Sequence, residues 1–141
     1  MRFLAVVVLV LALLAAVPAT ATAANVLKVT PGTVNFGSKP VGSSTVKATT
    51  ITNRSDEAIS LSLALVRSWD DFAGPAVEST CPGFEPALLQ PGESCALVER
   101  FSPSETFLGI KQDQIWLATA TDSQSGAVLE TEEIVFFGRA R

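Results

Sequence analysis

The chain has 141 residues, of which 48% are hydrophobic and 17% are charged, and its formal net charge is −4. It contains no histidine, which excludes the usual Ser-His-Asp and Cys-His catalytic arrangements and a histidine-based metal centre. The Lys and Arg residues are scattered along the sequence, which argues against nucleic acid and anionic membrane surfaces as partners.

The N-terminus has the pattern of an export signal. Arg2 supplies a positive charge, and the stretch 3–17 is uncharged and apolar. Pro18 ends this stretch, and small residues follow at 19–24 with the Ala-x-Ala spacing that a signal peptidase requires. A membrane-spanning helix needs about 20 apolar residues, so we expect a cleaved signal rather than a retained anchor.

We therefore predict a signal peptide over residues 1–24, cut after Ala23 or Ala24, and one domain over residues 25–141. The domain is expected to be secreted, or to lie in the periplasm or at the cell surface. No membrane insertion is expected after cleavage. Its formal charge is −5, because removal of Arg2 leaves 9 basic against 14 acidic residues.

The domain reads as short apolar and β-branched runs separated by turn residues. Its clearest signal is the alternation of aliphatic and small residues over 59–65, a period of two that places four aliphatic side chains on one face. In chain order we expect strands over 26–30, 34–36, 44–53, 59–65, 94–101, 111–121 and 128–137. About seven short strands with Pro and Gly in the connections predict an all-β fold, a β-sandwich.

Two cysteines, Cys81 and Cys95, lie 14 positions apart. In an exported chain an even pair indicates a disulfide. A metal site and a redox pair are the alternatives, but the chain has no histidine and the spacing is not Cys-x-x-Cys. A disulfide that closes a loop of about 15 residues contributes roughly 3 kcal/mol in the chain-entropy model.

An ordered set of short motifs resembles a known module. The set comprises VTPGTVNFG at 29–37, VGS at 41–43, ITN at 51–53, Asp71-Phe72, Cys81-Pro82, LQPGESC at 89–95, Phe101-Ser102-Pro103 and the closing pattern Ile134-x-Phe136-x-Gly138-x-Ala140. It is similar to the ASH-type immunoglobulin-like domain, labelled "choice-of-anchor D" in bacterial exported proteins. The resemblance spans nearly all of residues 25–141, and it implies an immunoglobulin-like antiparallel sandwich that acts as a scaffold or binding module without catalysis.

Two charged residues depart from this family pattern. Counting by twos places Glu99 on the same face as Leu97 and Phe101, where the family has an apolar residue. A similar count aligns Asp113 with Ile115 and Leu117. Neighbouring strands could pair Lys47 with Glu99 as a cross-strand polar pair; the alternative is that a bulge or strand end turns these charges to solvent.

Three large side chains are candidates for an interaction surface. If Ile115, Leu117, Ile134 and Phe136 face inward, then Trp116, Val135 and Phe137 face outward on hairpin neighbours. Such a contiguous apolar patch often marks a partner site. The alternative is that a loop such as 107–110 covers these side chains.

The sequence predicts no enzyme, no cofactor and no metal site. Asp70 and Asp71 are the obvious carboxylate pair, but adjacent residues on an extended chain point apart. We expect an exported structural or protein-interaction domain with a protein partner or self-association. The alternative is a carbohydrate-binding module that uses Trp69 with Asp70 and Asp71. A third reading is a pilus-type subunit or chaperone that acts by strand addition.

Overall fold

The computed structural model describes residues 25–141, and the predicted signal peptide lies outside this range. The described chain forms nine strands and one short 3₁₀ turn, η1 (Glu105–Phe107). The strands are β1 (Leu27–Thr30), β2 (Thr33–Lys39), β3 (Thr45–Asn53), β4 (Ile59–Arg67), β5 (Phe72–Ala73), β6 (Ala87–Leu89), β7 (Ser94–Phe101), β8 (Lys111–Asp122) and β9 (Val128–Ala140). The short strands β5 and β6 come in addition to the predicted ones, and β2 and β9 are longer than predicted.

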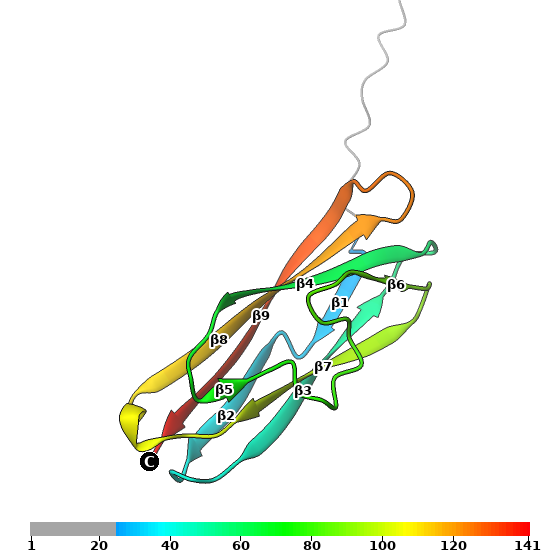
Figure 1. Ribbon diagram of the computed structural model, residues 1–141. Helices are drawn as coiled ribbons and strands as arrows, with labels where there is room; N and C mark the ends of the chain where they lie inside the picture. Colours follow the sequence, from blue (N-terminus) through cyan, green and yellow to red (C-terminus); the bar gives the residue numbers. More distant parts are fainter. Residues whose placement is uncertain (1–24) are drawn as a thin grey trace, which may run out of the picture.

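The strands form two sheets that pack face to face (Figure 1). The four-stranded sheet has the order β1-β3-β7-β5, and the five-stranded sheet has the order β2-β9-β8-β4-β6. Pairing is antiparallel except between β2 and β9, which run parallel. The chain crosses from one sheet to the other between β1 and β2, at Pro31-Gly32. The predicted immunoglobulin-like β-sandwich is confirmed, with one parallel pair in place of a wholly antiparallel arrangement.

Three aromatic rings fill the space between the sheets near the carboxyl end of β7. The ring centroids of Phe36, Phe72 and Phe101 lie 4.8 to 5.8 Å apart, and all three side chains are buried. Gly138 on β9 lies against them: a β-carbon at this position would be 2.6 Å from the Phe101 ring. The absence of a side chain at Gly138 therefore allows the Phe101 ring to pack directly on the β9 backbone.

The strand β8 faces the core with the opposite set of residues from the predicted one. Its buried positions are Gln112, Gln114, Trp116, Ala118 and Ala120. Both alternating sets of β8 contain apolar residues, so the period of two alone does not decide which set lies inside. The large Trp116 and the small alanines fill the narrow space between the sheets, while the intervening aliphatic residues turn outward.

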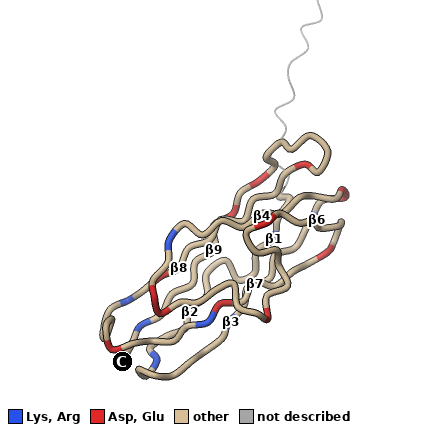
Figure 2. Tube along the Cα trace, viewed as in Figure 1, with Lys and Arg blue, Asp and Glu red and all other residues tan. Residues whose placement is uncertain are grey.

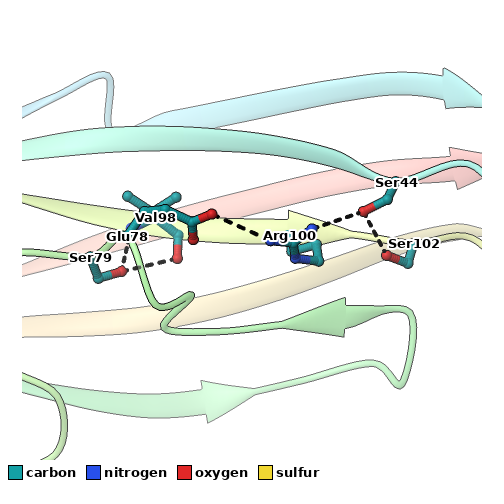
Figure 3. A network of polar contacts seen from close by, with 6 residues as sticks. All are labelled: Ser44, Glu78, Ser79, Val98, Arg100 and Ser102. Atoms are coloured by element: carbon teal, nitrogen blue, oxygen red, sulfur yellow. Dashed lines mark hydrogen bonds and ion pairs between the residues drawn. The ribbon is translucent and has the colours of Figure 1, made fainter.

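Residues 74–86 join β5 to β6 and cover the edge of β7. The backbone N–H groups of Ala76 and Thr80 donate to the carbonyls of Val98 and Ala96, at 2.8 and 2.9 Å. The hydroxyl of Ser79 accepts from the Val98 N–H at 2.8 Å (Figure 3). Backbone groups of β7 that β5 leaves unpaired are thus satisfied by this segment.

The predicted disulfide between Cys81 and Cys95 is confirmed and ties this segment to the start of β7. Arg100 makes a second, polar connection: its guanidinium donates to Glu78 at 3.4 Å and to the Ser44 hydroxyl at 3.3 Å (Figure 3). This ion pair is largely exposed and therefore weak. The covalent bond is the main constraint on residues 74–86.

Candidate interaction face

The outer face of the five-stranded sheet carries four half-buried apolar side chains, Ile115, Leu117, Val135 and Phe137, here called the apolar patch. They lie on the paired strands β8 and β9, where Ile115 is directly opposite Val135. The 3₁₀ turn contacts β9, but none of the elements in residues 25–141 lies over the patch as a covering layer (Figure 1). A continuous apolar area of this kind is a common feature of partner sites.

The predicted surface included Trp116, and this part of the prediction is wrong. Trp116 is fully buried between the sheets. Its ring packs against Phe84 of the segment 74–86, with 5.7 Å between the ring centroids. The alternative of a covering loop such as 107–110 does not explain the burial of Trp116, which lies between the sheets. Val135 and Phe137 lie on the outer face as predicted.

Asp113 shares a face with Ile115 and Leu117, as the count by twos predicted, and the phase of β8 turns this face outward. Its carboxylate accepts a hydrogen bond from Arg67 at 2.9 Å and one from the Trp69 indole N–H at 3.2 Å. The Trp69 ring also meets the Phe107 ring edge-on, at 5.2 Å between centroids. These contacts make the border of the outer face beside the apolar patch and neutralise the Asp113 charge.

Trp69, Asp70 and Asp71, the residues considered for carbohydrate binding, lie in different environments. Trp69 packs over the end of the sandwich, and Asp71 is buried. Burial alone would raise the pKa of Asp71, but hydrogen bonds from Ser104 and Gln112 outweigh it and lower the pKa. Asp70 alone is exposed. Trp69, Asp70 and Asp71 do not form a single open platform.

Two basic residues lie at one end of the outer face, here called the basic end. Lys111 on β8 is directly opposite Arg139 on β9, and both are exposed. The Lys111 ammonium lies 4.3 Å above the Phe137 ring, a cation–π contact. Within residues 25–141 neither cation makes an ion pair with a carboxylate.

A shallow pocket of about 250 Å³ opens at the basic end. It is lined by Asn35, Gly37, Ser38, Lys111, Phe137, Gly138 and Arg139. Figure 2 shows several basic residues toward the end of the domain where the chain terminates, together with some acidic ones, and acidic residues around the opposite end, where β8 turns into β9. The outer face therefore runs from a cationic end through an apolar centre to an acidic end.

Lys47 and Glu99 are neighbours across β3 and β7, but their side chains do not pair. The two residues are directly opposite in the β3–β7 register, but the Lys47 ammonium donates to the Asn35 carbonyl at 2.7 Å and is exposed. Glu99 is fully buried and accepts a hydrogen bond from the Gln114 amide at 2.7 Å. No ion pair joins Lys47 and Glu99, so the prediction of a charged pair is wrong, as is the alternative that Glu99 turns to solvent.

Burial raises the pKa of Glu99 to about 7, because the charged carboxylate loses its hydration. The Gln114 amide and the Trp116 indole N–H lower the pKa and offset part of this effect. The indole N–H lies near the carboxylate without full hydrogen-bond geometry, so Glu99 Oε1 and Trp116 Nε1 lack partners. The carboxylate lies where a side chain on Gly74 would be.

No group of three or more metal-ligating side chains occurs among residues 25–141. The same residues contain no helix with the length and apolar character needed to cross a membrane. Glu99, whose pKa burial raises to about 7, lies between the sheets and is not among the residues that line the pocket at the basic end.

Comparison with solved structures defines the class of fold. The described domain has the fold of the ASH and PapD-like domains, a branch of the immunoglobulin-like sandwiches. It is similar to PapD-like domain 7 of human CEP192, with a TM-score of 0.68, 12% identity, and coverage of 99% of this chain and 98% of that one. No family model matches the sequence, and no curated protein is matched by sequence.

Two further structures share the fold. WR4, an MSP family member of C. elegans, has a TM-score of 0.50 and 13% identity, with coverage of 82% of this chain and 98% of that one. The E. coli chaperone DraB has a TM-score of 0.55 and 14% identity, with coverage of 81% of this chain and 54% of that one. At these identities the similarity establishes the fold alone, and the resemblance to an ASH-type domain is confirmed at that level.

Proposed function

We propose that this protein is an exported, non-catalytic domain that binds another protein through the outer face of its five-stranded sheet. Export is supported by the signal-like pattern of residues 1–24 and by the Cys81–Cys95 disulfide, which is typical of oxidising compartments. The ordered motifs that resemble the "choice-of-anchor D" type also support an exported bacterial domain. The sandwich serves as a rigid support for the binding face.

The observation that carries this proposal is the position of the apolar patch on the outer face of the five-stranded sheet. Three features favour the sheet face over a sheet edge. The edge strands β1, β5 and β6 are only four, two and three residues long. The longer edge strand β2 has an irregular register at Gly37, and the Lys47 ammonium occupies the Asn35 carbonyl. Short and irregular edges protected by lysine disfavour strand addition.

The test compares partner capture by matched variants. Val135→Asp places a charge in the apolar patch, and Val46→Asp places the same charge on an exposed valine of the four-stranded sheet. The purified, oxidised protein and both variants are immobilised and exposed to the extracytoplasmic proteins of the producing cell. Proteins captured by the wild type are identified by mass spectrometry and then titrated in purified form.

We expect a partner that Val46→Asp captures like the wild type and that Val135→Asp binds at least tenfold more weakly, a difference of about 1.4 kcal/mol. Melting temperatures of both variants should stay close to that of the wild type, because both sites lie on the surface. Equal binding by the two variants would refute the assignment to this face. Binding of glycans that depends on Trp69 would instead support the carbohydrate-binding alternative, which no described contact favours.

A further inference from the structure

We infer that the outer face of the five-stranded sheet is self-complementary and that its partner is a second copy of this chain, joined in a twofold-symmetric dimer. This inference rests on the proposed function, which assigns binding to the same face. The order of side chains along β9 and β8 makes the face complementary to itself and leaves charges at both ends of the series without partners.

The outward positions of β9 follow a simple series. Glu133, Val135, Phe137 and Arg139 alternate with the inward residues and so share the outer face. The series begins with an acid, continues with two apolar residues and ends with a base. Like Arg139, Glu133 is exposed and makes no ion pair within residues 25–141. Both charges therefore remain available to an incoming surface.

Reversing this series about its midpoint yields its own complement. A second copy laid face to face, with its β9 antiparallel to the first, places Glu133 over the second Arg139 and Val135 over the second Phe137. The twofold axis repeats each contact, so two such acid–base contacts form about 20 Å apart, given a rise of about 3.3 Å per residue. An isologous contact of this kind closes as a dimer.

The neighbouring strand supports the same arrangement. Leu117 is opposite Glu133 and Lys111 is opposite Arg139 in the β8–β9 register. The reversal that matches β9 therefore brings Leu117 over the aliphatic stem of the second Lys111, a contact that long basic side chains make readily. The same reversal brings Ile115 over the second Asp113, whose carboxylate is already bonded to Arg67 and Trp69.

The charge distribution also selects the relative direction of the two copies. With the strands parallel, the basic end of one copy would lie over the basic end of the other, and like charges brought together disfavour association. The antiparallel arrangement joins the basic end to the acidic end (Figure 2). The available face is small compared with a stable interface of about 1,200–2,000 Å², so we expect a weak, salt-sensitive dimer.

The test uses charge reversal of the purified, oxidised protein, with sedimentation equilibrium over about 1–500 µM protein, a range suited to micromolar dissociation constants. The wild type should shift from monomer toward dimer as its concentration rises, and added salt should weaken the dimer. Glu133→Arg alone and Arg139→Glu alone should each stay monomeric, because each places like charges together twice. An equimolar mixture of these two variants should regain association, since only the mixed pair restores both contacts.

Two further variants complete the design. Val135→Asp should abolish association, and Lys28→Glu, an equal charge reversal on the other sheet, should dimerise like the wild type. Sedimentation of the wild type as a monomer throughout, or a mixture no more associated than its components, would overturn the inference. If a different protein is still captured and Val135→Asp prevents its capture, the proposed function stands and only the second copy is excluded as the partner. If Val135→Asp changes neither self-association nor partner capture, the inference and the proposed function both fail.

Discussion

The buried carboxyl of Glu99 predicts that this domain becomes less stable as the pH rises through neutrality. Its pKa is raised from 4.5 to about 7 in the folded protein. The folded state therefore holds a proton between these values that the unfolded state has released. The contribution of Glu99 to stability is fully present below about pH 4.5, falls as the pH rises, and reaches a lower plateau above about pH 7. A shift of this size corresponds to a loss of about 3 kcal/mol.

The assay is urea unfolding of the oxidised protein at several pH values between 4.5 and 8, at constant ionic strength. Glu99→Gln replaces the carboxyl by an uncharged group of nearly the same shape. We expect the variant to match the wild type near pH 4.5 and to exceed it by up to about 3 kcal/mol at pH 8, because the uncharged side chain carries no penalty of burying a charge. Its free energy of unfolding should be nearly independent of pH over this range.

Among the other carboxyls of residues 25–141 with shifted pKa values, Asp71 and Asp122 shift in the opposite direction and Glu132 in the same direction. The pKa values of Asp71 and Asp122 are lowered, so the stability that they contribute is lost as the pH falls, mostly below this range. Burial and the nearby Glu130 raise the pKa of Glu132, so Glu132→Gln is the matched control. Equal pH slopes in the wild type and Glu99→Gln, or a slope removed by Glu132→Gln instead, would refute the reasoning.

Three further changes test the core and the disulfide. Replacing Cys81 and Cys95 together by serine should lower the free energy of unfolding by roughly 3 kcal/mol, measured by urea titration against the oxidised protein; an unchanged midpoint would contradict this. Trp116→Ala should cost about 3–5 kcal/mol, and a variant that melts like the wild type would show that the side chain is not buried. Gly138→Ala should lower the free energy of unfolding by about 1–3 kcal/mol, because the new β-carbon would lie 2.6 Å from the Phe101 ring. The double variant with Phe101→Leu should lose less stability than the sum of the losses of the two single variants.

The sequence predicts the fold well because strand formation depends on local patterns. Alternation over 59–65, turn residues between runs and two cysteines were sufficient for the sandwich and its disulfide. The strands β5 and β6 have two and three residues, too few to show a period. They form because the edges of β7 and β4 offer unpaired backbone groups. This cause lies in the tertiary structure, so the local sequence pattern does not indicate it.

The candidate site is harder to predict because it depends on which side of β8 faces inward. Ile115 and Leu117 are at least as apolar as Gln114, Trp116 and Ala118, which alternate with them, so hydrophobicity alone does not identify the buried set. The polar pairs between β8 and the rest of the core decide it: Gln114 bonds Glu99, as Gln112 bonds Asp71. Two glutamines on the same face as a tryptophan could be interpreted correctly only once their buried acidic partners were known.

The segment 74–86 links the solubility of the protein to the redox state of its surroundings. With Cys81 and Cys95 reduced, this segment is held to β7 mainly by hydrogen bonds, and its release would leave backbone groups of β7 open to another chain. Exposed strand edges favour aggregation. We therefore expect a reducing agent to increase light scattering on warming, and the oxidised protein to stay clear. In that case the covalent bond protects the chains from one another by holding the segment 74–86 over the edge of β7.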